Sequence, residues 1–406
     1  MKILFFSSYF SPETMAASFR ATENSKIWNK MGHDVTVFTG YPNYPLGKIF
    51  DGYVPKLLTI EDFEGIKIIR SKMIAKPNTS IINRLENALS YCFYGLYNIL
   101  INKNKIVTNY DVVLGSSGVI FNALLAKIYA FLYRKPFVLE IRDITYKQMI
   151  ASGKKEKGIS VRLMKCLELF LCNKADKVVV VSNGYKKILS EEGVPSNKFE
   201  VITNGVDVKS KLNDSSNTDK FTLSYFGTLG LSQNISQTFK YAEVLSKMIS
   251  NFQYLIIGDG AEKKVVTETA ANYSFSIVKP ILPPEQLEAD YKETQLSIIA
   301  LKKSGNFQYT IPSKLFQIMG RGIAVLYIGP DGECADIIRK HNAGIVLTET
   351  IEEDLAMLEE FFSDPNWSEK LYEMGRNGYL AVKNNYSRRQ LACDYINVLE
   401  QAKKKN

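Results

Sequence analysis

A lysine at the start of a predicted helix is the residue of this chain best placed to do chemistry. Residues 311–326 read IPSKLFQIMGRGIAVL, which is typical of a loop, a helix and then a buried strand. Pro312 suits the first turn of a helix, Ser313 can accept hydrogen bonds from the free amides there, and Lys314 adds a positive charge. Such a helix start binds phosphate, although an ordinary αβ unit with a capped helix has the same pattern.

Glycines follow two predicted strands in the same half of the chain. Residues 226–235 read FGTLGLSQNI, and residues 256–264 read IIGDGAEKK. Glycine lets a backbone approach a phosphate or sugar closely, but it also serves tight turns that bind nothing. With the helix above, these turns give a set of candidate binding residues: Gly227, Thr228, Gly230, Gln233, Gly258 and Gly260.

Two further candidate sites follow strands of the first half. The turn at residues 8–20, SYFSPETMAASFR, lacks the glycine spacing of a dinucleotide fingerprint, so NAD binding is disfavoured. Its candidate contacts are Pro12, Glu13, Ala16 and Ala17. The second site, EIRDI, ends an apolar strand, where Arg142 could hold a phosphate while Asp143 orients a hydroxyl. A structural pair between Arg142 and an acid is the alternative.

Several function classes are disfavoured by what the sequence lacks. The two histidines, His33 and His341, have no neighbours typical of a metal site or hydrolytic triad, and no GxSxG motif occurs. We therefore predict no metal. Five scattered cysteines without a CxxC pair indicate a reducing compartment. The most apolar stretch, residues 88–101, is shorter than the roughly 20 residues of a membrane span.

Strands and helices alternate along the chain in two successive series, which predicts an α/β fold of two doubly wound domains. The first series, with strands predicted at 2–7, 34–39, 66–70, 112–115, 137–140, 177–182 and 200–202, ends before a polar stretch. The pattern restarts at Phe221, with strands predicted at 221–226, 254–258, 275–278, 296–300, 324–328 and 344–347. The tail carries a capping box at Ser387 and Gln390, followed by one apolar stripe that needs a partner surface. We predict a first domain at 1–208, a linker at 209–220, a second domain at 221–385 and a docking C-terminal helix at 386–406.

Basic and aromatic residues gather in two stretches of the first domain. The chain carries 51 Lys and Arg against 42 Asp and Glu, a net charge of +9, which favours an anionic partner. Residues 71–105 mix bases with tyrosines and Phe93, and residues 147–165 hold six bases and one acid. These stretches are typical of attachment to an anionic membrane face, with solvated helical faces as the alternative. No nucleic-acid-binding module accompanies the charge.

Four landmarks together resemble the family-4 glycosyltransferases of the GT-B fold. They are the opening KILFFSSYFSPE with GHDVTV, the stretch ADKVVVVS, the turn TNGVD, and GDG followed by PSKLFQIMGRG. The resemblance covers essentially the whole chain. It implies two Rossmann-like domains facing a central cleft, with a nucleotide-sugar donor on the second and an acceptor on the first, at Pro12, Glu13, Ala16 and Ala17. It also implies retention of anomeric configuration without a metal or other cofactor.

Within that family, the chain resembles the branch that assembles O-antigen and capsule repeats, including L-fucosamine transferases. The resemblance implies a UDP-linked hexosamine or deoxyhexosamine donor, a polyprenyl-diphosphate-linked saccharide acceptor, and a cytoplasmic enzyme peripheral to the inner face of the plasma membrane. Lys314 would stabilise the leaving diphosphate, helped by Arg142 or Lys302, while Asp143 would orient a hydroxyl. A sugar-nucleotide epimerase and a non-catalytic scaffold of polysaccharide assembly are the alternatives.

The chain departs from the family pattern at two positions near that lysine. Many members carry two glutamates separated by seven residues, and the alignment of the PSK helix places Tyr309 at the first position and Gln317 at the second. Gln317 can still hydrogen-bond a ribose hydroxyl, but neither residue supplies a negative charge. The donor side predicted from the resemblance therefore includes Tyr309, Ser313 and Gln317 in addition to the glycine turns.

Overall fold

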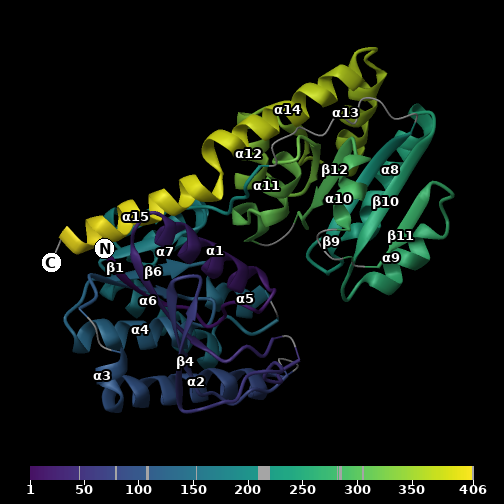
Figure 1. Ribbon diagram of the computed structural model, residues 1–406. Helices are drawn as coiled ribbons and strands as arrows, with labels where there is room; N and C mark the ends of the chain where they lie inside the picture. The colour runs from purple at the N-terminus through teal and green to yellow at the C-terminus, as the bar shows by residue number, and fades with distance from the viewer. Residues whose placement is uncertain are drawn as a thin grey trace. The chain divides into compact units, whose positions relative to one another are not determined.

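The described residues divide into two units, which correspond to the two series of strands and helices (Figure 1). The computed structural model describes residues 1–44, 46–77, 80–106, 109–151, 153–208, 220–280, 282, 286–303 and 306–404. Unit 1 contains Met1–Ile202 and Leu391–Asn406, and unit 2 contains Thr203–Gln390. The expected linker at 209–220 lies outside the described residues except for Lys220.

Unit 1 is built on an eight-stranded sheet with the order β3-β4-β2-β1-β5-β6-β7-β8. All neighbouring strands are parallel except β3, which pairs antiparallel with β4. The sequence analysis missed β3, because this edge strand reads LTIEDF and is only half-buried, without the apolar run that marks the other strands. The strands are β1 (Lys2–Phe6), β2 (Asp34–Gly40), β3 (Leu58–Phe63), β4 (Ile66–Ser71), β5 (Val112–Ser116), β6 (Phe137–Ile141), β7 (Lys177–Val180) and β8 (Phe199–Val201).

Helices cover both faces of this sheet, as parallel strands require. One face packs on α2 (Ile81–Ile101), α4 (Ile120–Leu132), α6 (Ile159–Lys174) and α7 (Asn183–Glu191). The other packs on α1 (Ala16–Lys30) and on α15 (Arg388–Lys404). Short helical segments complete the unit: α3 (Lys103–Ile106), α5 (Thr145–Ala151) and η1 (Ser196–Lys198).

The C-terminal helix α15 lies on unit 1 through the apolar stripe seen in the sequence (Figure 1). The indole nitrogen of Trp28 donates to the carbonyl of Ala392 at 3.0 Å, and Tyr395 packs beside Trp28. At its start, the amide of Gln390 donates to the hydroxyl of Ser387 at 3.2 Å. The chain therefore leaves unit 1 after Ile202 and returns to it at Leu391.

Unit 2 is built on a fully parallel six-stranded sheet with the order β11-β10-β9-β12-β13-β14. Three of its strands coincide with the sequence prediction, β12, β13 and β14, because each is a short, mostly apolar run of the length of a buried strand. The strands are β9 (Phe221–Thr228), β10 (Phe252–Asp259), β11 (Ser276–Lys279), β12 (Leu296–Ala300), β13 (Ala324–Ile328) and β14 (Gly344–Leu347).

The helices of unit 2 also form two layers. One core contains side chains of α8 (Thr238–Met248), α9 (Lys263–Ala270) and α13 (Ile351–Ser363). The other contains side chains of α10 (Leu287–Lys292), α11 (Ser313–Met319), α12 (Glu333–Lys340) and α14 (Trp367–Asn385). Two 3-10 helices, η3 (Ile235–Gln237) and η4 (Asn306–Tyr309), lie in loops at the ends of strands.

Each sheet has one point where the strand order reverses, between β1 and β5 in unit 1 and between β9 and β12 in unit 2. Ligands of open α/β sheets bind beyond the carboxyl ends of the strands at such a point. In unit 2 the β9–β12 pairing ends at Ser224 and Ser297, whose hydroxyls lie 3.0 Å apart. By contrast, β9 stays paired with β10 as far as Thr228 and Asp259. The residues of β9 that follow Ser224 therefore lie where the sheet divides.

Candidate active site

Lys314, in the first turn of α11, reaches the point where β9 and β12 part. Its Nζ lies 2.8 Å from the hydroxyl of Tyr225 and 4.1 Å from the centre of that tyrosine's ring. Among the described residues, no carboxylate lies within ion-pair distance of this Nζ. Burial without a counter-ion lowers the pKa of Lys314 to about 7. The site thus holds an amine whose protonation would be favoured by any anion bound beside it.

The end of strand β9 encloses that amine. Tyr225 donates its phenolic proton to the carbonyl of Thr228 at 2.6 Å, so its oxygen accepts from Lys314. Gly227 has a φ of +129°, and a Cβ built there would come within 3.0 Å of the Nζ of Lys314. A side chain at position 227 would therefore crowd the amine, which gives a structural reason for glycine here.

The two glycines after β10 are required by contacts between protein loops. A Cβ on Gly258 would lie 2.0 Å from the carbonyl oxygen of Gly227, and one on Gly260 would lie 2.3 Å from that of Leu229. The loops are also hydrogen-bonded, because Leu229 donates to Asp259 at 2.8 Å and Glu262 donates to Leu229 at 2.9 Å. These glycines hold the β9 and β10 turns together beside Lys314.

The predicted polar residues of the β9 turn lie around the same strand end. Thr228 is exposed at the end of β9, and Gln233 folds back on its own turn. The amide of Gln233 donates to the carbonyl of Gly230 at 3.0 Å, and a Cβ on Gly230 would lie 2.8 Å from the Oε1 of Gln233. The exposed Thr228 side chain and the Gln233 amide group are thus presented at the loop that borders Lys314.

The other predicted donor residues lie before α11 and along it, and they differ in how exposed they are. Pro312 takes the cap position and Ser313 is the first helical residue, exposed, so the expectation that Ser313 caps the helix is wrong. Gln317 lies one turn beyond Lys314 and is half-buried, and its carbonyl accepts from Arg321 at 2.8 Å. Tyr309 ends η4, four residues before α11, and is also half-buried.

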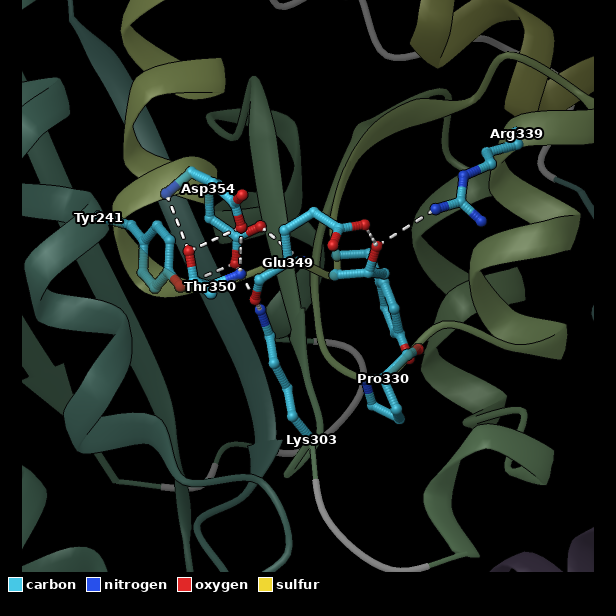
Figure 2. A network of polar contacts seen from close by, with 10 residues as sticks. Tyr241, Lys303, Pro330, Arg339, Glu349, Thr350 and Asp354 are labelled. Atoms are coloured by element: carbon cyan, nitrogen blue, oxygen red, sulfur yellow. Dashed lines mark hydrogen bonds and ion pairs between the residues drawn. The ribbon is translucent and has the colours of Figure 1, made fainter.

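An ion pair between the partly exposed Lys303 and a buried aspartate fastens the loop that leads from β12 towards α11 (Figure 2). Lys303 donates to Asp354, whose side chain is fully buried, at 2.5 Å, and also to the carbonyl of Glu349. Asp354 accepts in addition from the hydroxyl of Tyr241 at 3.2 Å and from the amide of Glu349 at 3.0 Å. Lys303 therefore has a carboxylate partner within the protein, whereas Lys314 has none among the described residues.

In unit 1, the turn after β1 is held by Glu13. Its Oε1 accepts from the amides of Asn43 at 2.9 Å and Tyr44 at 3.0 Å, while burial raises the pKa of the carboxyl and these bonds oppose the rise. Arg70, which is 1% exposed, ties the same turn to β2 through the carbonyls of Ser11 and Gly40. Glu13 thus positions the turn on which Pro12 and Ala16 are exposed and Ala17 is half-buried.

Arg142 and Asp143 lie at the end of β6, within a charged cluster of unit 1. The Oε1 of the buried Glu140 lies 3.4 Å from Arg20 and 3.7 Å from Arg142, and it accepts from Tyr395 of α15 at 2.6 Å. Burial acts to raise the pKa of Glu140, but the two arginines outweigh it, so the pKa lies below its ordinary value. Asp143 is exposed. The sequence alternative of a structural pair for Arg142 is therefore present in the molecule.

Two features of the site were not marked by the sequence. Tyr225 reads as an ordinary inward-facing strand residue, two positions after Leu223, and nothing in its neighbourhood distinguishes it. Glu262 reads as part of a charged helix start, yet its Oε2 is buried without a hydrogen-bond partner among the described residues, and its charge acts on Tyr225. Only the fold brings Tyr225 next to Lys314 and Glu262 within electrostatic range of Tyr225.

The described residues show neither a metal-like cluster of side chains nor a membrane-spanning helix. No group of three or more His, Cys, Asp or Glu side chains is arranged to hold a metal ion within the described ranges. Over the same residues, no helix combines the length and the apolar character needed to cross a bilayer.

The chain is similar to known glycosyltransferases in both sequence and fold. Residues 20–210 match the model of Glycosyltransferase Family 4. This chain is a glycosyltransferase, and its residues 20–210 are similar to family 4. Among curated proteins, this glycosyltransferase is 22% identical over 412 residues to an uncharacterized glycosyltransferase of Methanocaldococcus jannaschii, covering 98% of each chain. It is 22% identical over 341 residues to WcaI of Escherichia coli K12, a putative colanic acid biosynthesis glycosyl transferase, covering 79% of this chain and 82% of WcaI.

Solved structures share the fold of this glycosyltransferase over its whole length. Sucrose-phosphate synthase of Thermosynechococcus elongatus matches with a TM-score of 0.70 at 14% identity, covering 100% of both chains. HepE of Anabaena in complex with UDP matches with a TM-score of 0.66 at 13% identity, covering 99% of this chain and 100% of HepE. The expected α/β fold of the GT-B type is confirmed.

The contact between the two glycine turns predicts a large effect of one methyl group. Gly258→Ala should lower the free energy of unfolding by at least about 2 kcal/mol, because the new Cβ meets the carbonyl of Gly227 and overpacks the site. Gly118→Ala is the control, since a Cβ there has no neighbour within 4 Å, and it should change stability by less than about 0.5 kcal/mol. Urea denaturation measures both; equal stabilities would contradict the packing described.

Proposed function

We propose that this glycosyltransferase moves a hexosamine or deoxyhexosamine from UDP to a lipid-linked saccharide of an O-antigen or capsule, with retention of configuration. The observation that carries the proposal is Lys314, a half-buried lysine with no carboxylate partner among the described residues, at the point of unit 2 where β9 and β12 part. A bound diphosphate would supply the missing counter-ion. HepE, of similar fold, binds UDP, which supports uridine as the base.

The proposed chemistry needs a cation more than a base. The acceptor hydroxyl attacks the anomeric carbon on the face from which the diphosphate departs, and the bond from that carbon to the phosphate oxygen breaks. The departing phosphate oxygen takes the proton of the hydroxyl, so no side chain has to act as a base. Lys314 would stabilise the negative charge that develops on the diphosphate. The proposed donor contacts around it are Gly227, Thr228, Gly230, Gln233, Gly258, Gly260, Tyr309, Ser313 and Gln317.

The acceptor is proposed to bind unit 1 where its strand order reverses. The exposed Pro12 and Ala16 and the half-buried Ala17 lie on the turn that Glu13 holds in place, after β1. At the end of β6, Arg20 and Arg142 lie around Glu140, and the exposed Asp143 follows them in the same charged cluster. Arg142 would face a phosphate of the acceptor, and Asp143 would orient its hydroxyl.

Attachment to an anionic membrane is proposed for the helical layer formed by α2, α4 and α6. The exposed apolar residues of α2 recur at helical spacing, with Ile82 69% and Phe93 67% exposed. Since α4 packs against both α2 and α6, the outer sides of the three helices belong to one layer. Exposed Leu, Ile and Phe side chains continue onto α4 and α6: Phe131, Leu132, Ile159, Leu163 and Phe170.

Basic residues accompany this layer, as binding to acidic lipids requires. Lys72, Lys103 and Lys105 are exposed near α2, and Lys155, Lys157 and Arg162 are exposed near the start of α6. A helix with an apolar side and flanking cations lies in the plane of a bilayer surface. The membrane would be the inner face of the plasma membrane, where a polyprenyl-diphosphate acceptor is anchored.

A panel assay tests the proposed reaction. Purified protein is incubated with UDP-sugars and a synthetic lipid-diphosphate disaccharide, and products are separated by mass spectrometry. We expect one donor to extend the acceptor by a single sugar with retained configuration. A changed free sugar nucleotide would support epimerisation instead, and the absence of both products would support the non-catalytic scaffold.

Lys314→Ala should lower kcat by roughly 10²–10³, because it removes a cation that stabilises charge developing in the transition state. The matched control is Lys264→Ala on α9 of the same unit, whose Nζ has a single carboxylate neighbour at 3.8 Å and whose side chain is 88% exposed. Steady-state kinetics with the donor found above measures both variants. Unchanged turnover in Lys314→Ala would remove this residue from the mechanism.

The double variant Ile82→Ser with Phe93→Ser should bind anionic vesicles at least about tenfold more weakly, because two exposed apolar side chains no longer enter the bilayer. Sedimentation with phosphatidylglycerol vesicles measures binding, and phosphatidylcholine vesicles test the need for charge. Met357→Ser, at an exposed apolar residue of α13, is the control. If vesicle binding changes neither with lipid charge nor with the α2 substitutions, attachment through this layer is refuted.

A further inference from the structure

The phenol of Tyr225 is arranged so that it can only accept a hydrogen bond from Lys314. Its single proton goes to the carbonyl of Thr228 at 2.6 Å, which leaves the oxygen lone pairs for the Nζ at 2.8 Å. Burial raises the pKa of Tyr225 well above its ordinary value, so the phenol stays neutral. The pair is therefore an amine held by a neutral acceptor rather than an ion pair.

The ring of Tyr225 adds a second contact that depends on the charge of the amine. The Nζ of Lys314 lies 4.1 Å from the ring centre, within the range of a cation–π interaction. Both contacts favour the ammonium form over the neutral amine, whereas burial of the lysine disfavours it. Tyr225 thus counteracts desolvation and keeps part of Lys314 protonated near neutral pH.

We propose that Tyr225 is a positioning residue for Lys314, which holds the ammonium beside Gly227 until the diphosphate of the donor takes its place as partner. This inference rests on the proposed donor site. The missing side chain at Gly227 leaves the space the Nζ occupies, since a Cβ there would lie 3.0 Å from it. A phosphate oxygen is a stronger acceptor than a phenol, so the diphosphate would replace Tyr225 as the partner of the lysine when the donor binds.

The other titratable groups near this pair are few. Glu262, at the start of α9, and Tyr254, on β10, act electrostatically on the phenol of Tyr225. The elements packed against α11 are α14, β13 and β12. In the described part of the chain, none of them places a carboxylate within ion-pair distance of the Nζ. The ionisation of Lys314 is therefore governed by burial and by Tyr225.

The test compares Tyr225→Phe with Tyr327→Phe. Tyr327, on β13 of the same sheet, is equally buried and also donates to a backbone carbonyl, that of Pro330, at 2.9 Å. Acylation of Lys314 by acetic anhydride, followed by mass spectrometry across pH, gives the midpoint at which the amine loses its proton. We expect this midpoint to move to lower pH in Tyr225→Phe and to stay unchanged in Tyr327→Phe.

Binding of UDP, measured by titration calorimetry, gives a second readout. At pH 8 we expect UDP to bind Tyr225→Phe about three- to tenfold more weakly than wild type, and at pH 6, where Lys314 is protonated in both, the difference should shrink. A purely structural role would change thermal stability but would move neither the acylation midpoint nor the pH dependence of binding. That result would overturn the proposal.

The two readouts also separate this proposal from the proposed function. Wild-type protein that does not bind UDP would refute the donor site, whereas the acylation midpoints would still decide whether Tyr225 controls Lys314. If Tyr225→Phe does not fold, Tyr225→Leu is the second variant, and it should lower the midpoint further because it removes the ring as well. An unchanged midpoint in the folded variant refutes the positioning role.

Discussion

The proposed site of unit 2 depends on one partly desolvated amine, Lys314, which has no carboxylate partner in the described part of the chain. A charge in this position costs free energy unless an anion joins it, and burial lowers the pKa of Lys314 to about 7 as a result. Lys303, which is partly exposed, has a buried aspartate as its partner. Lys314 has no such partner among the described residues, so an arriving phosphate would favour its ammonium form and pair with that charge.

The topology of the sheet explains why that amine is accessible at all. Strand β12 leaves β9 after Ser224 and Ser297, so the residues that follow on β9 have no strand neighbour on that side. The β9 turn is instead fastened to the β10 turn through Gly258, Gly260 and Leu229. The strand end that carries Tyr225 and Gly227 is therefore rigid on one side and open to α11 on the other, which is the geometry a preorganised site requires.

The sequence was sufficient for the architecture and for the central lysine. Buried parallel strands are near-continuous apolar runs, which is why β12, β13 and β14 were located to the residue, while the amphipathic edge strand β3 was missed. Lys314 was evident because a cation at a helix start is a local pattern. Tyr225 and Glu262 were not evident from the sequence. Tyr225 contacts Lys314, which lies 89 positions away in the chain, and Glu262 acts on Tyr225 only through its charge. The local pattern also predicted that Ser313 caps the helix, whereas Pro312 occupies the cap position and no side chain caps it.

The replacement of two family acids by Tyr309 and Gln317 fits the electrostatics of this site. A carboxylate close to Lys314 would pair with it, raise its pKa and compete with the diphosphate for the same ammonium. Without such acids, Lys314 has only Tyr225 as partner among the described residues, and its charge state follows pH and ligand directly. Under the proposed mechanism the departing diphosphate accepts the proton of the acceptor hydroxyl, so the loss of the acids removes no base. It leaves a single cation to stabilise the leaving group, and a phenol to keep that cation charged.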